Sequence, residues 1–220
     1  MGFDKAALEL GGRTLLERAL ASLRPLCDEV LLATGSTPRY LELGLPLVLD
    51  RASDLGPLAG LEAALEAARF ERVLVIAVDM PAVESALLRQ IAERAERDDC
   101  DVLLLASAAG VEPLCGAYHT RVAPAVRAAL DADERRMTAV FRHPLSDGRP
   151  PRLEVLDAEP LGHARALANV NTSADLVRAR AEFGAATVVG AASVVGAATV
   201  VDARGGGDFA PEYAHHEVNS

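Results

Sequence analysis

The stretch RVLVIAVDMP, residues 72–81, decides the fold class of this chain. After Arg72 the apolar residues follow one another without polar alternation, which predicts a strand buried on both faces. The strand ends at Asp79-Met80-Pro81, because proline fixes its own φ and has no N–H for a sheet ladder. A strand of this kind belongs to a sheet that lies between two layers of helices.

Segments of the same kind alternate with helical patterns along the chain. Further strands are predicted at residues 29–33, 46–49 and 102–106, helices at 15–23, 58–69 and 83–97, and weaker elements at 114–118, 121–132 and 152–156. Thr14 and Glu17 have capping-box spacing before the first helix. The alternation predicts a doubly wound α/β fold, with a mostly parallel sheet and helices on both faces. Ligands of such sheets bind beyond the carboxyl ends of the strands.

The composition limits the classes of function that this chain can have. With 220 residues, 50% of them hydrophobic, and a formal net charge of −10, it has the balance of a globular domain and would repel a polyphosphate backbone. The charged N-terminus does not resemble a secretory signal. Cys27, Cys100 and Cys115 have no metal-ligand spacing, which predicts free thiols. We therefore expect a cytoplasmic protein without nucleic-acid or membrane partners.

The character of the chain changes at Gly184. Residues 184–201 read GAATVV, GAASVV and GAATVV, and residues 202–220 are glycine-rich and polar. A six-residue period is compatible with one coil of a β-helix, but three hexads are too few to stand alone. We expect a domain over residues 1–183 and a flexible tail over 184–220, in which the repeat packs weakly or not at all.

This arginine-rich chain contains only one lysine and three asparagines. A bias of this kind in composition replaces lysine and asparagine wherever another residue can do the same chemistry. The lysine and asparagines that remain are therefore candidate functional residues, although a single lysine can persist by chance. Lys5 lies in the opening MGFDKA, where its compact charge suits contact with a phosphate. Asn169 and Asn171 lie in NVNT, residues 169–172, and could hold a polar ligand just before a helix that starts near Ser173.

Two aspartates end predicted strands. Asp79 suits Mg²⁺, which favours one or two carboxylates plus phosphate oxygens; the alternative is that Asp79 caps the helix that starts near Val83. Asp50 precedes GPLAG, residues 56–60, and could accept hydrogen bonds from a purine. The glycines there would let a planar ligand approach the backbone, and the helix start offers N–H donors. The alternative is an ordinary tight loop before a helix.

The order of these motifs resembles one family. Six segments follow one another as they do in molybdenum cofactor guanylyltransferases, within the wider group of nucleotide-sugar-like nucleotidyltransferases: MGFDKA, the segment from Asp50 to Gly60, Asp79-Met80-Pro81, EPLCGAY (112–118), ERRM (134–137) and NVNT. The resemblance covers residues 1–183. Each motif is only moderately specific, and the ordered set carries the identification.

The resemblance implies an activity and a site. In that family a nucleoside triphosphate binds with Mg²⁺, the terminal phosphate of molybdopterin attacks the α-phosphorus of GTP, and pyrophosphate leaves. GTP and molybdopterin would be the substrates, and cofactor-delivery proteins or molybdoenzymes further partners. The implied roles are triphosphate contact for Lys5, Mg²⁺ and nucleotide for Asp79, nucleotide binding for Asp50, Gly56, Pro57 and Leu58, and the pterin pocket for Asn169 and Asn171. Such transfers depend on positioning and on cations, so no protein nucleophile is needed.

The chain also departs from the family pattern. The family begins with a strand and a glycine-rich loop of the form LAGGxSxRMGxDK, and this chain starts at the Met of that motif. The resemblance therefore predicts a sheet without its first, central strand, and weak or absent catalysis. Where the family often has Asn, this chain has Ala33-Thr34-Gly35, so one nucleotide contact is not assured. Ser173 stands where the family commonly has Pro.

Residues and resemblance together predict a magnesium-dependent guanylyltransferase of molybdenum cofactor synthesis. Two alternatives stay open. A cytidylyltransferase acting on the same pterin is one, because base choice rests on few contacts, although NVNT and the Asp50 segment favour guanine. The other is a truncated, non-catalytic nucleotide-binding protein.

Overall fold

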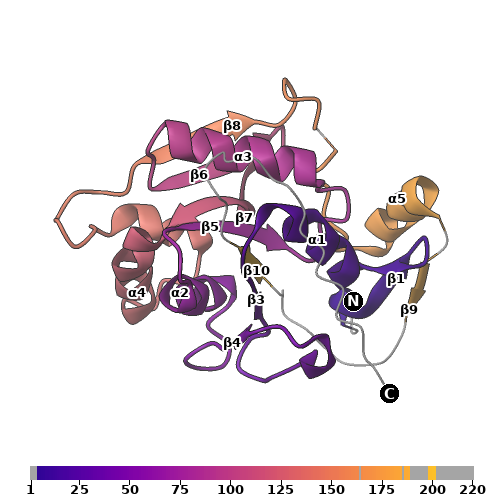
Figure 1. The fold of residues 1–220 in the computed structure, drawn as a ribbon, viewed down its shortest axis with the longest axis horizontal. Coiled ribbons are helices and arrows are strands. Elements are labelled where there is room, and N and C mark those ends of the chain that lie inside the picture. The colour runs from indigo at the N-terminus through magenta and orange to yellow at the C-terminus, as the bar shows by residue number, and fades with distance from the viewer. Residues whose placement is uncertain (1–3, 164, 185, 189–197, 202–220) are drawn as a thin grey trace, which may run out of the picture.

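The computed structural model describes residues 4–163, 165–184, 186–188 and 198–201, which form two sheets and the helices around them (Figure 1). The strands are β1 (Leu8–Leu10), β2 (Arg13–Thr14), β3 (Val30–Ala33), β4 (Leu47–Val48), β5 (Arg72–Ala77), β6 (Val102–Ser107), β7 (Gly110–His119), β8 (Leu153–Asp157), β9 (Ala186–Val188) and β10 (Ala198–Val201). The α-helices are α1 (Leu15–Leu23), α2 (Pro57–Ala67), α3 (Ser85–Arg97), α4 (Ala123–Asp131) and α5 (Ser173–Phe183). Within the described part of the chain, no helix is long and apolar enough to cross a membrane.

The larger sheet has the strand order β4-β3-β10-β5-β7-β6-β8. β3 pairs in parallel with β4, and β6 pairs in parallel with β8. β7 runs antiparallel to both β5 and β6, and β10 runs antiparallel to both β3 and β5. Five of the seven strands therefore share one direction, and their carboxyl ends lie at one edge. This is the predicted doubly wound α/β architecture.

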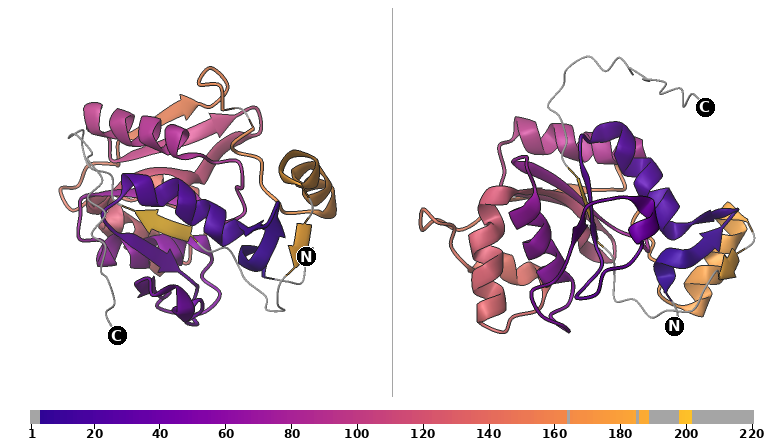
Figure 2. Two further views of the ribbon diagram at one scale, coloured as in Figure 1. Left: turned by 45° about the vertical axis from the view of Figure 1, so that its right-hand side comes forward. Right: turned by 60° about the horizontal axis from the view of Figure 1, so that its bottom comes forward.

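Helices cover both faces of the sheet, as the unbroken apolar strand predicts (Figure 2). Leu74 and Ile76 of β5 belong to the core on the side of α1 and α3. Val73 and Val75 of the same strand belong to the core on the side of α2 and α4. Because successive side chains of a strand point to opposite faces, one apolar run serves both cores. Ile76 is fully buried, and its replacement by Ala would cost roughly 2–5 kcal/mol of stability.

The centre of the sheet differs from the expectation. The resemblance predicts a sheet without its central strand, but β10, which is part of the third hexad, lies between β3 and β5. Thr199 is paired with Leu32 on one side and with Ile76 on the other. The sheet is therefore continuous, and the repeat, for which weak packing is predicted, supplies a strand with two neighbours. The physical reason is that unpaired backbone groups of two neighbouring strands favour any β-branched segment that can reach them.

The second sheet has the order β2-β1-β9 and is antiparallel throughout. β9 comes from the first hexad of the repeat, and α5 lies close to β1. Residues 202–220, predicted to be a flexible tail, lie outside the described residues. The division of the chain at residue 184 stays a prediction.

The element boundaries follow the sequence patterns closely. α1 spans the predicted residues, and its capping box joins Thr14 and Glu17 in both directions. β7 is longer than the predicted segment 114–118, because it continues as an antiparallel partner of β6. α3 begins at Ser85 rather than at Val83.

Candidate active site

Lys5, Asp79 and Asn171 come together at the carboxyl end of β5. Lys5 Nζ lies 3.0 Å from Asp79 Oδ2, with side-chain exposures of 22% and 16%. Lys5 Nζ also donates a hydrogen bond to Asn171 Oδ1. The lone lysine therefore meets two of the other predicted site residues, which lie far away in the sequence. The ammonium group suits the charge of a phosphate at this point.

A local network positions Lys5 in its short 3₁₀ helix, Lys5–Ala7. The carboxylate of Asp4, which is buried, accepts a hydrogen bond of 2.9 Å from the backbone N–H of Ala6. Tyr40 donates its hydroxyl hydrogen to the same carboxylate. Burial, and then this bond to Asp4, raises the pKa of Tyr40 well above its usual range. The sequence patterns did not reveal the roles of Asp4 and Tyr40, because the two residues are 36 positions apart.

The NVNT turn docks on the end of β5. The backbone N–H of Val170 donates to the carbonyl of Asp79 over 2.8 Å. Thr172 is the N-cap of α5 and forms a capping box with Asp175. Asn169 donates from Nδ2 to Glu112 Oε2 over 3.3 Å. The two asparagines are thus held on either side of a main-chain bond to Asp79.

The alternative role for Asp79 as a helix cap is wrong. The N-cap of α3 is Glu84, and Asp79 lies in the turn that directly follows β5. Among the described residues, no group of three or more His, Cys, Asp or Glu side chains could hold a metal ion. Asp79 therefore offers a single carboxylate, which fits Mg²⁺ when phosphate oxygens and water complete the coordination.

Asp50 lies at the same edge of the sheet, two residues after β4. β3 and β10 separate β4 from β5, so the strands that lead to Asp50 and Asp79 are roughly 14 Å apart at ordinary strand spacing. Asp50 Oδ1 is buried and has no hydrogen-bond partner among the described residues. A buried acceptor without a partner is destabilising, and it points to a donor on a ligand.

The start of α2 lies next to Asp50. Gly56 is its N-cap, with a φ of 76° that favours glycine, and Pro57 is its first residue. A Cβ on Gly60 would lie 3.7 Å from Asp50 Oδ1. The side chain of Leu58 is fully buried, so Leu58 can contribute to a nucleotide site only through its backbone.

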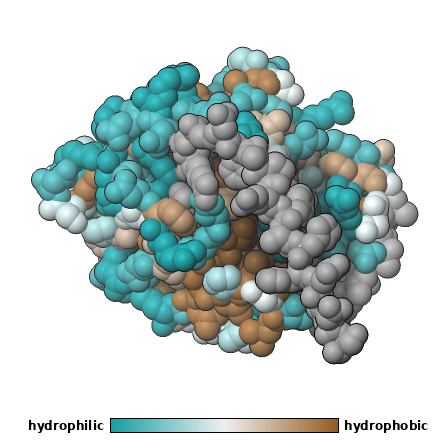
Figure 3. Space-filling model, viewed as in Figure 1, coloured by the Kyte–Doolittle hydropathy of each residue, from teal (hydrophilic) through white to brown (hydrophobic). Residues whose placement is uncertain are grey.

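Glu62 of α2 is a buried charge that the sequence patterns did not reveal. Arg51 and Arg127 each lie 3.4 Å from its carboxylate. Burial, and then the negative charge of Glu62, raises the pKa of Asp50. In the space-filling view, apolar surface gathers over the region of β4 (Figure 3), where Leu49 is 39% exposed. Asp50 directly follows this exposed apolar residue in the chain, and an apolar neighbour suits a planar base.

A cavity of about 570 Å³ lies between the Asp79-Met80-Pro81 turn and α5. Its lining includes Pro81, Asn169, Arg178 and Phe183. The volume falls within the range of small-molecule sites. The cavity shares Asn169 with the NVNT turn, and Asn171 of the same turn contacts Lys5.

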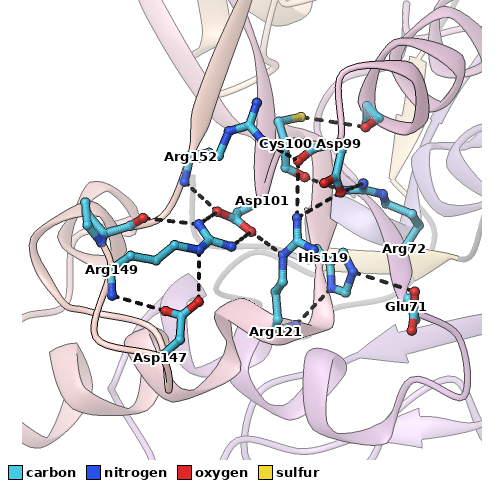
Figure 4. Close-up of polar contacts among 12 residues, drawn as sticks. Glu71, Arg72, Asp99, Cys100, Asp101, His119, Arg121, Asp147, Arg149 and Arg152 are labelled. Carbon is cyan, nitrogen blue, oxygen red and sulfur yellow. Dashed lines mark hydrogen bonds and ion pairs between the residues drawn. The ribbon is translucent and has the colours of Figure 1, made fainter.

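A second cluster of charged residues surrounds Asp101, just before β6 (Figure 4). Asp101 is fully buried and accepts hydrogen bonds from the side chains of Arg121 and Arg149 and from the backbone N–H of Arg152. Burial would raise the pKa of Asp101, but these bonds outweigh it and hold the pKa well below its usual range. Both carboxylate oxygens are satisfied, and the cluster lies at the amino end of β6. It braces the loop before β8.

Comparison with known protein families gives a match over most of the chain. The family described as MobA-like NTP transferase domain matches residues 1–148. A probable molybdenum cofactor guanylyltransferase of Carboxydothermus hydrogenoformans is 37% identical over 175 residues, which cover 80% of this chain and 86% of the relative. A second probable molybdenum cofactor guanylyltransferase, from Mycobacterium marinum, is 34% identical and covers 80% of this chain and 85% of the relative.

The fold also matches a solved structure. The crystal structure of molybdopterin-guanine dinucleotide biosynthesis protein A from Archaeoglobus fulgidus superposes with a TM-score of 0.67. It covers 82% of this chain and 91% of the other chain, at 23% sequence identity. This likeness supports the architecture, with its sheet between two helical layers.

Proposed function

Because this chain belongs to the MobA-like NTP transferase family, we propose that it transfers GMP from GTP to the phosphate of molybdopterin and releases pyrophosphate. The observation that carries the proposal is the convergence of Lys5, Asp79 and Asn171 at one point of the sheet edge. It brings together the residues for the triphosphate, the metal ion and the pterin. A transfer between two phosphates needs the reacting groups to meet at such a point.

The triphosphate end of GTP is assigned to Lys5 and Asp79. An oxygen of the molybdopterin phosphate forms a new bond to the α-phosphorus, and the bond from the α-phosphorus to the bridging oxygen breaks. Pyrophosphate leaves with that electron pair. Lys5 offsets the charge that grows on the phosphates, and Asp79 would hold Mg²⁺, which neutralises part of the same charge. The two side chains pair with each other, so a phosphate bound at this point would meet both of them.

The guanine is assigned to the surroundings of Asp50 and the start of α2. A guanine ring presents an N–H and an amino group side by side, and an ionised carboxylate can accept from both. Cytosine presents an amino group next to an acceptor nitrogen, which a carboxylate repels. The buried, unpartnered Oδ1 of Asp50 therefore favours the guanylyltransferase over the cytidylyltransferase.

The pterin is assigned to the side of Asn169 and Asn171. Asn171 contacts Lys5, and Asn169 lines the cavity next to Pro81. A substrate in that cavity would place its phosphate near Lys5. This arrangement gives the two substrates separate sites on either side of the reacting phosphorus.

Calorimetric titration with GTP and with CTP, each with Mg²⁺, tests the proposal. We expect tighter binding of GTP, and loss of that preference in Asp50→Ala. Incubation of the wild-type chain with GTP and molybdopterin should then yield the guanine dinucleotide and pyrophosphate. Tighter binding of CTP would reject the guanine assignment, and GTP binding without transfer would support the non-catalytic alternative.

A further inference from the structure

A bulge interrupts β7 at the start of the EPLCGAY segment. Leu104 of β6 pairs with Gly116, but the next residue, Leu105, pairs with Glu112. Residues 113–115 therefore have no counterpart on β6. Bulges are common next to active sites, because they bend a strand and redirect a side chain. This bulge precedes the segment of β7 that pairs with β5. The proposed site lies at the carboxyl end of β5.

Three residues of the same segment hold the bulge in place. Tyr118, which is fully buried, donates its hydroxyl hydrogen to the carbonyl of Pro113 over 2.7 Å. Pro113 has no N–H of its own, so its place in the bulge leaves no donor unsatisfied. A Cβ on Gly116 would lie 2.3 Å from the carbonyl oxygen of Leu103, so only glycine fits there. The bulge is thus a built feature of this sequence.

The bulge directs the carboxylate of Glu112 to Asn169. Glu112 Oε1 accepts from the backbone N–H of Leu114 over 3.2 Å, which orients the side chain. Glu112 Oε2 accepts from Nδ2 of Asn169 over 3.3 Å. An ionised carboxylate can only accept hydrogen bonds. The amide nitrogen of Asn169 must therefore face Glu112, and the amide oxygen must face away from it.

The oxygen of Asn169 is left free by this arrangement. Asn169 Oδ1 is buried and has no hydrogen-bond partner among the described residues. Asn169 also lines the cavity of about 570 Å³ next to Pro81. A buried amide oxygen next to a cavity is an acceptor that awaits a donor.

We propose that Glu112 is a positioning residue for the second substrate: it holds the amide of Asn169 so that Oδ1 accepts a hydrogen bond from an N–H group of the pterin. The proposal rests on the proposed function, because it assumes a pterin in this cavity. The pyrimidinone ring of a pterin carries N–H and amino donors, which match a fixed acceptor. Without Glu112 the amide of Asn169 can rotate and turn its N–H donor toward the pterin. Two N–H donors cannot form a hydrogen bond with each other.

Calorimetric titrations with molybdopterin and with GTP test this role in Glu112→Ala, Asn169→Ala and the double variant. We expect Glu112→Ala to weaken molybdopterin binding by about tenfold, the effect of one misplaced hydrogen bond, and to leave GTP binding within twofold. In the Asn169→Ala background, loss of Glu112 should have no further effect, because Glu112 acts through Asn169. Glu112→Gln should keep most of the affinity, since its amide oxygen can still accept from Asn169. Glu154→Ala, on β8 of the same sheet, is the matched control.

Three outcomes would overturn the proposal: unchanged molybdopterin affinity in Glu112→Ala, equal losses for both ligands, or additive losses in the double variant. A wild-type chain that does not bind molybdopterin would instead refute the proposed function. In that case the Glu112–Asn169 pair is still testable by NMR without substrate. The side-chain amide hydrogens of Asn169 should exchange with solvent faster in Glu112→Ala than in Glu154→Ala, and equal exchange would reject the pairing.

Discussion

Lys5 Nζ lies 3.0 Å from Asp79 Oδ2, although 74 positions separate the two residues in the sequence. The pair joins the first described helical turn to the end of the central apolar strand. Both partners are largely buried, with 22% and 16% of their side chains exposed. The only lysine of the chain is thus held against the carboxylate that we assign to Mg²⁺.

Replacement of Lys5 should mainly affect the rate of transfer. We expect Lys5→Ala to lower the turnover number by on the order of a hundredfold, because a preorganised charge at the phosphates is lost. Lys5→Arg should recover only part of the rate, since the planar guanidinium cannot take the place of a compact ammonium. Steady-state kinetics with GTP and molybdopterin measure both effects. Wild-type turnover in Lys5→Ala would remove Lys5 from the site.

Replacement of Asp79 should remove the response to metal ions. Asp79→Asn keeps the shape of the side chain and an oxygen that can accept from Lys5, but it loses the charge that Mg²⁺ needs. We expect Mn²⁺ to be coordinated only by GTP and water, without the change in its electron paramagnetic resonance spectrum that a protein ligand causes, and we expect no stimulation by Mg²⁺. Glu84→Gln, which changes the N-cap of α3, is the control and should bind Mn²⁺ normally. If Mn²⁺ with GTP gives the wild-type spectrum in Asp79→Asn, the metal site lies elsewhere.

Binding of GTP should depend on pH through Asp50. Burial and the charge of Glu62 raise the pKa of Asp50, so the carboxyl takes up its proton at a higher pH than an exposed aspartate. The protonated form loses one acceptor, and affinity should fall about tenfold per pH unit below the raised pKa. Titrations from pH 8 to pH 4 measure the profile.

Two variants distinguish this cause from others. Glu62→Gln removes the neighbouring charge, so the loss of affinity should move to lower pH. Asp50→Asn should bind GTP weakly at every pH and should not lower the melting temperature, because burial disfavours the charged carboxylate in the folded state. An unchanged pH profile in both variants would mean that another group controls binding.

The central position of β10 predicts a strong effect of proline. Thr199 has paired neighbours on both sides, in β3 and in β5, so Thr199→Pro removes a ladder hydrogen bond whichever neighbour the N–H faces. We expect a loss of roughly 3 kcal/mol or more of unfolding free energy. Thr187→Pro is the matched control, since Thr187 occupies the same place in the first hexad and pairs with β1 alone. Denaturant unfolding of the two variants should differ clearly, and equal midpoints would contradict the position of β10.

The Asp101 cluster should control stability in acid. The pKa of Asp101 is lowered in the folded state, so its contribution is complete above the pKa of an unfolded aspartate, near 3.9, and is lost as pH falls below that value. Asp101→Asn should cost roughly 3 kcal/mol at neutral pH, because two arginines lose a buried partner. It should also flatten the acid dependence of stability. Asp147→Asn, at an exposed partner of Arg149, is the control, and equal losses in the two variants would show that burial of Asp101 is not the cause.

Much of the fold follows from local patterns. The apolar run of β5 predicts burial on two faces, and the Thr14–Glu17 spacing predicts the start of α1. The scarcity of lysine and asparagine predicts Lys5, Asn169 and Asn171 as candidate residues, and the structure brings Lys5 and Asn171 into contact. The order of the motifs predicts the family that the comparisons show. These features can be predicted from the sequence because each depends on the spacing or the type of residues within a short segment.

Other parts of the site depend on contacts between distant segments. Glu112 gains a role only because a bulge turns it toward Asn169, and no local pattern shows where a strand will be out of register. Asp4 and Tyr40 support Lys5 through a hydrogen bond across the fold. The pKa of Asp50 is raised first by its own burial and then by the negative charge of Glu62, which lies on a different element.

The amino-acid sequence by itself determined the layered α/β class, the start of α1 and the candidate residues Lys5, Asp50 and Asp79. Only the tertiary structure decided which hexad lies inside the larger sheet and whether the oxygen or the nitrogen of the Asn169 amide is left without a partner. The first and third hexads have the same letters, GAATVV, yet one pairs with β1 and the other lies between β3 and β5. The physical reason is that local propensity selects strand over helix, whereas the choice of partner depends on which backbone donors and acceptors the rest of the fold has left unpaired.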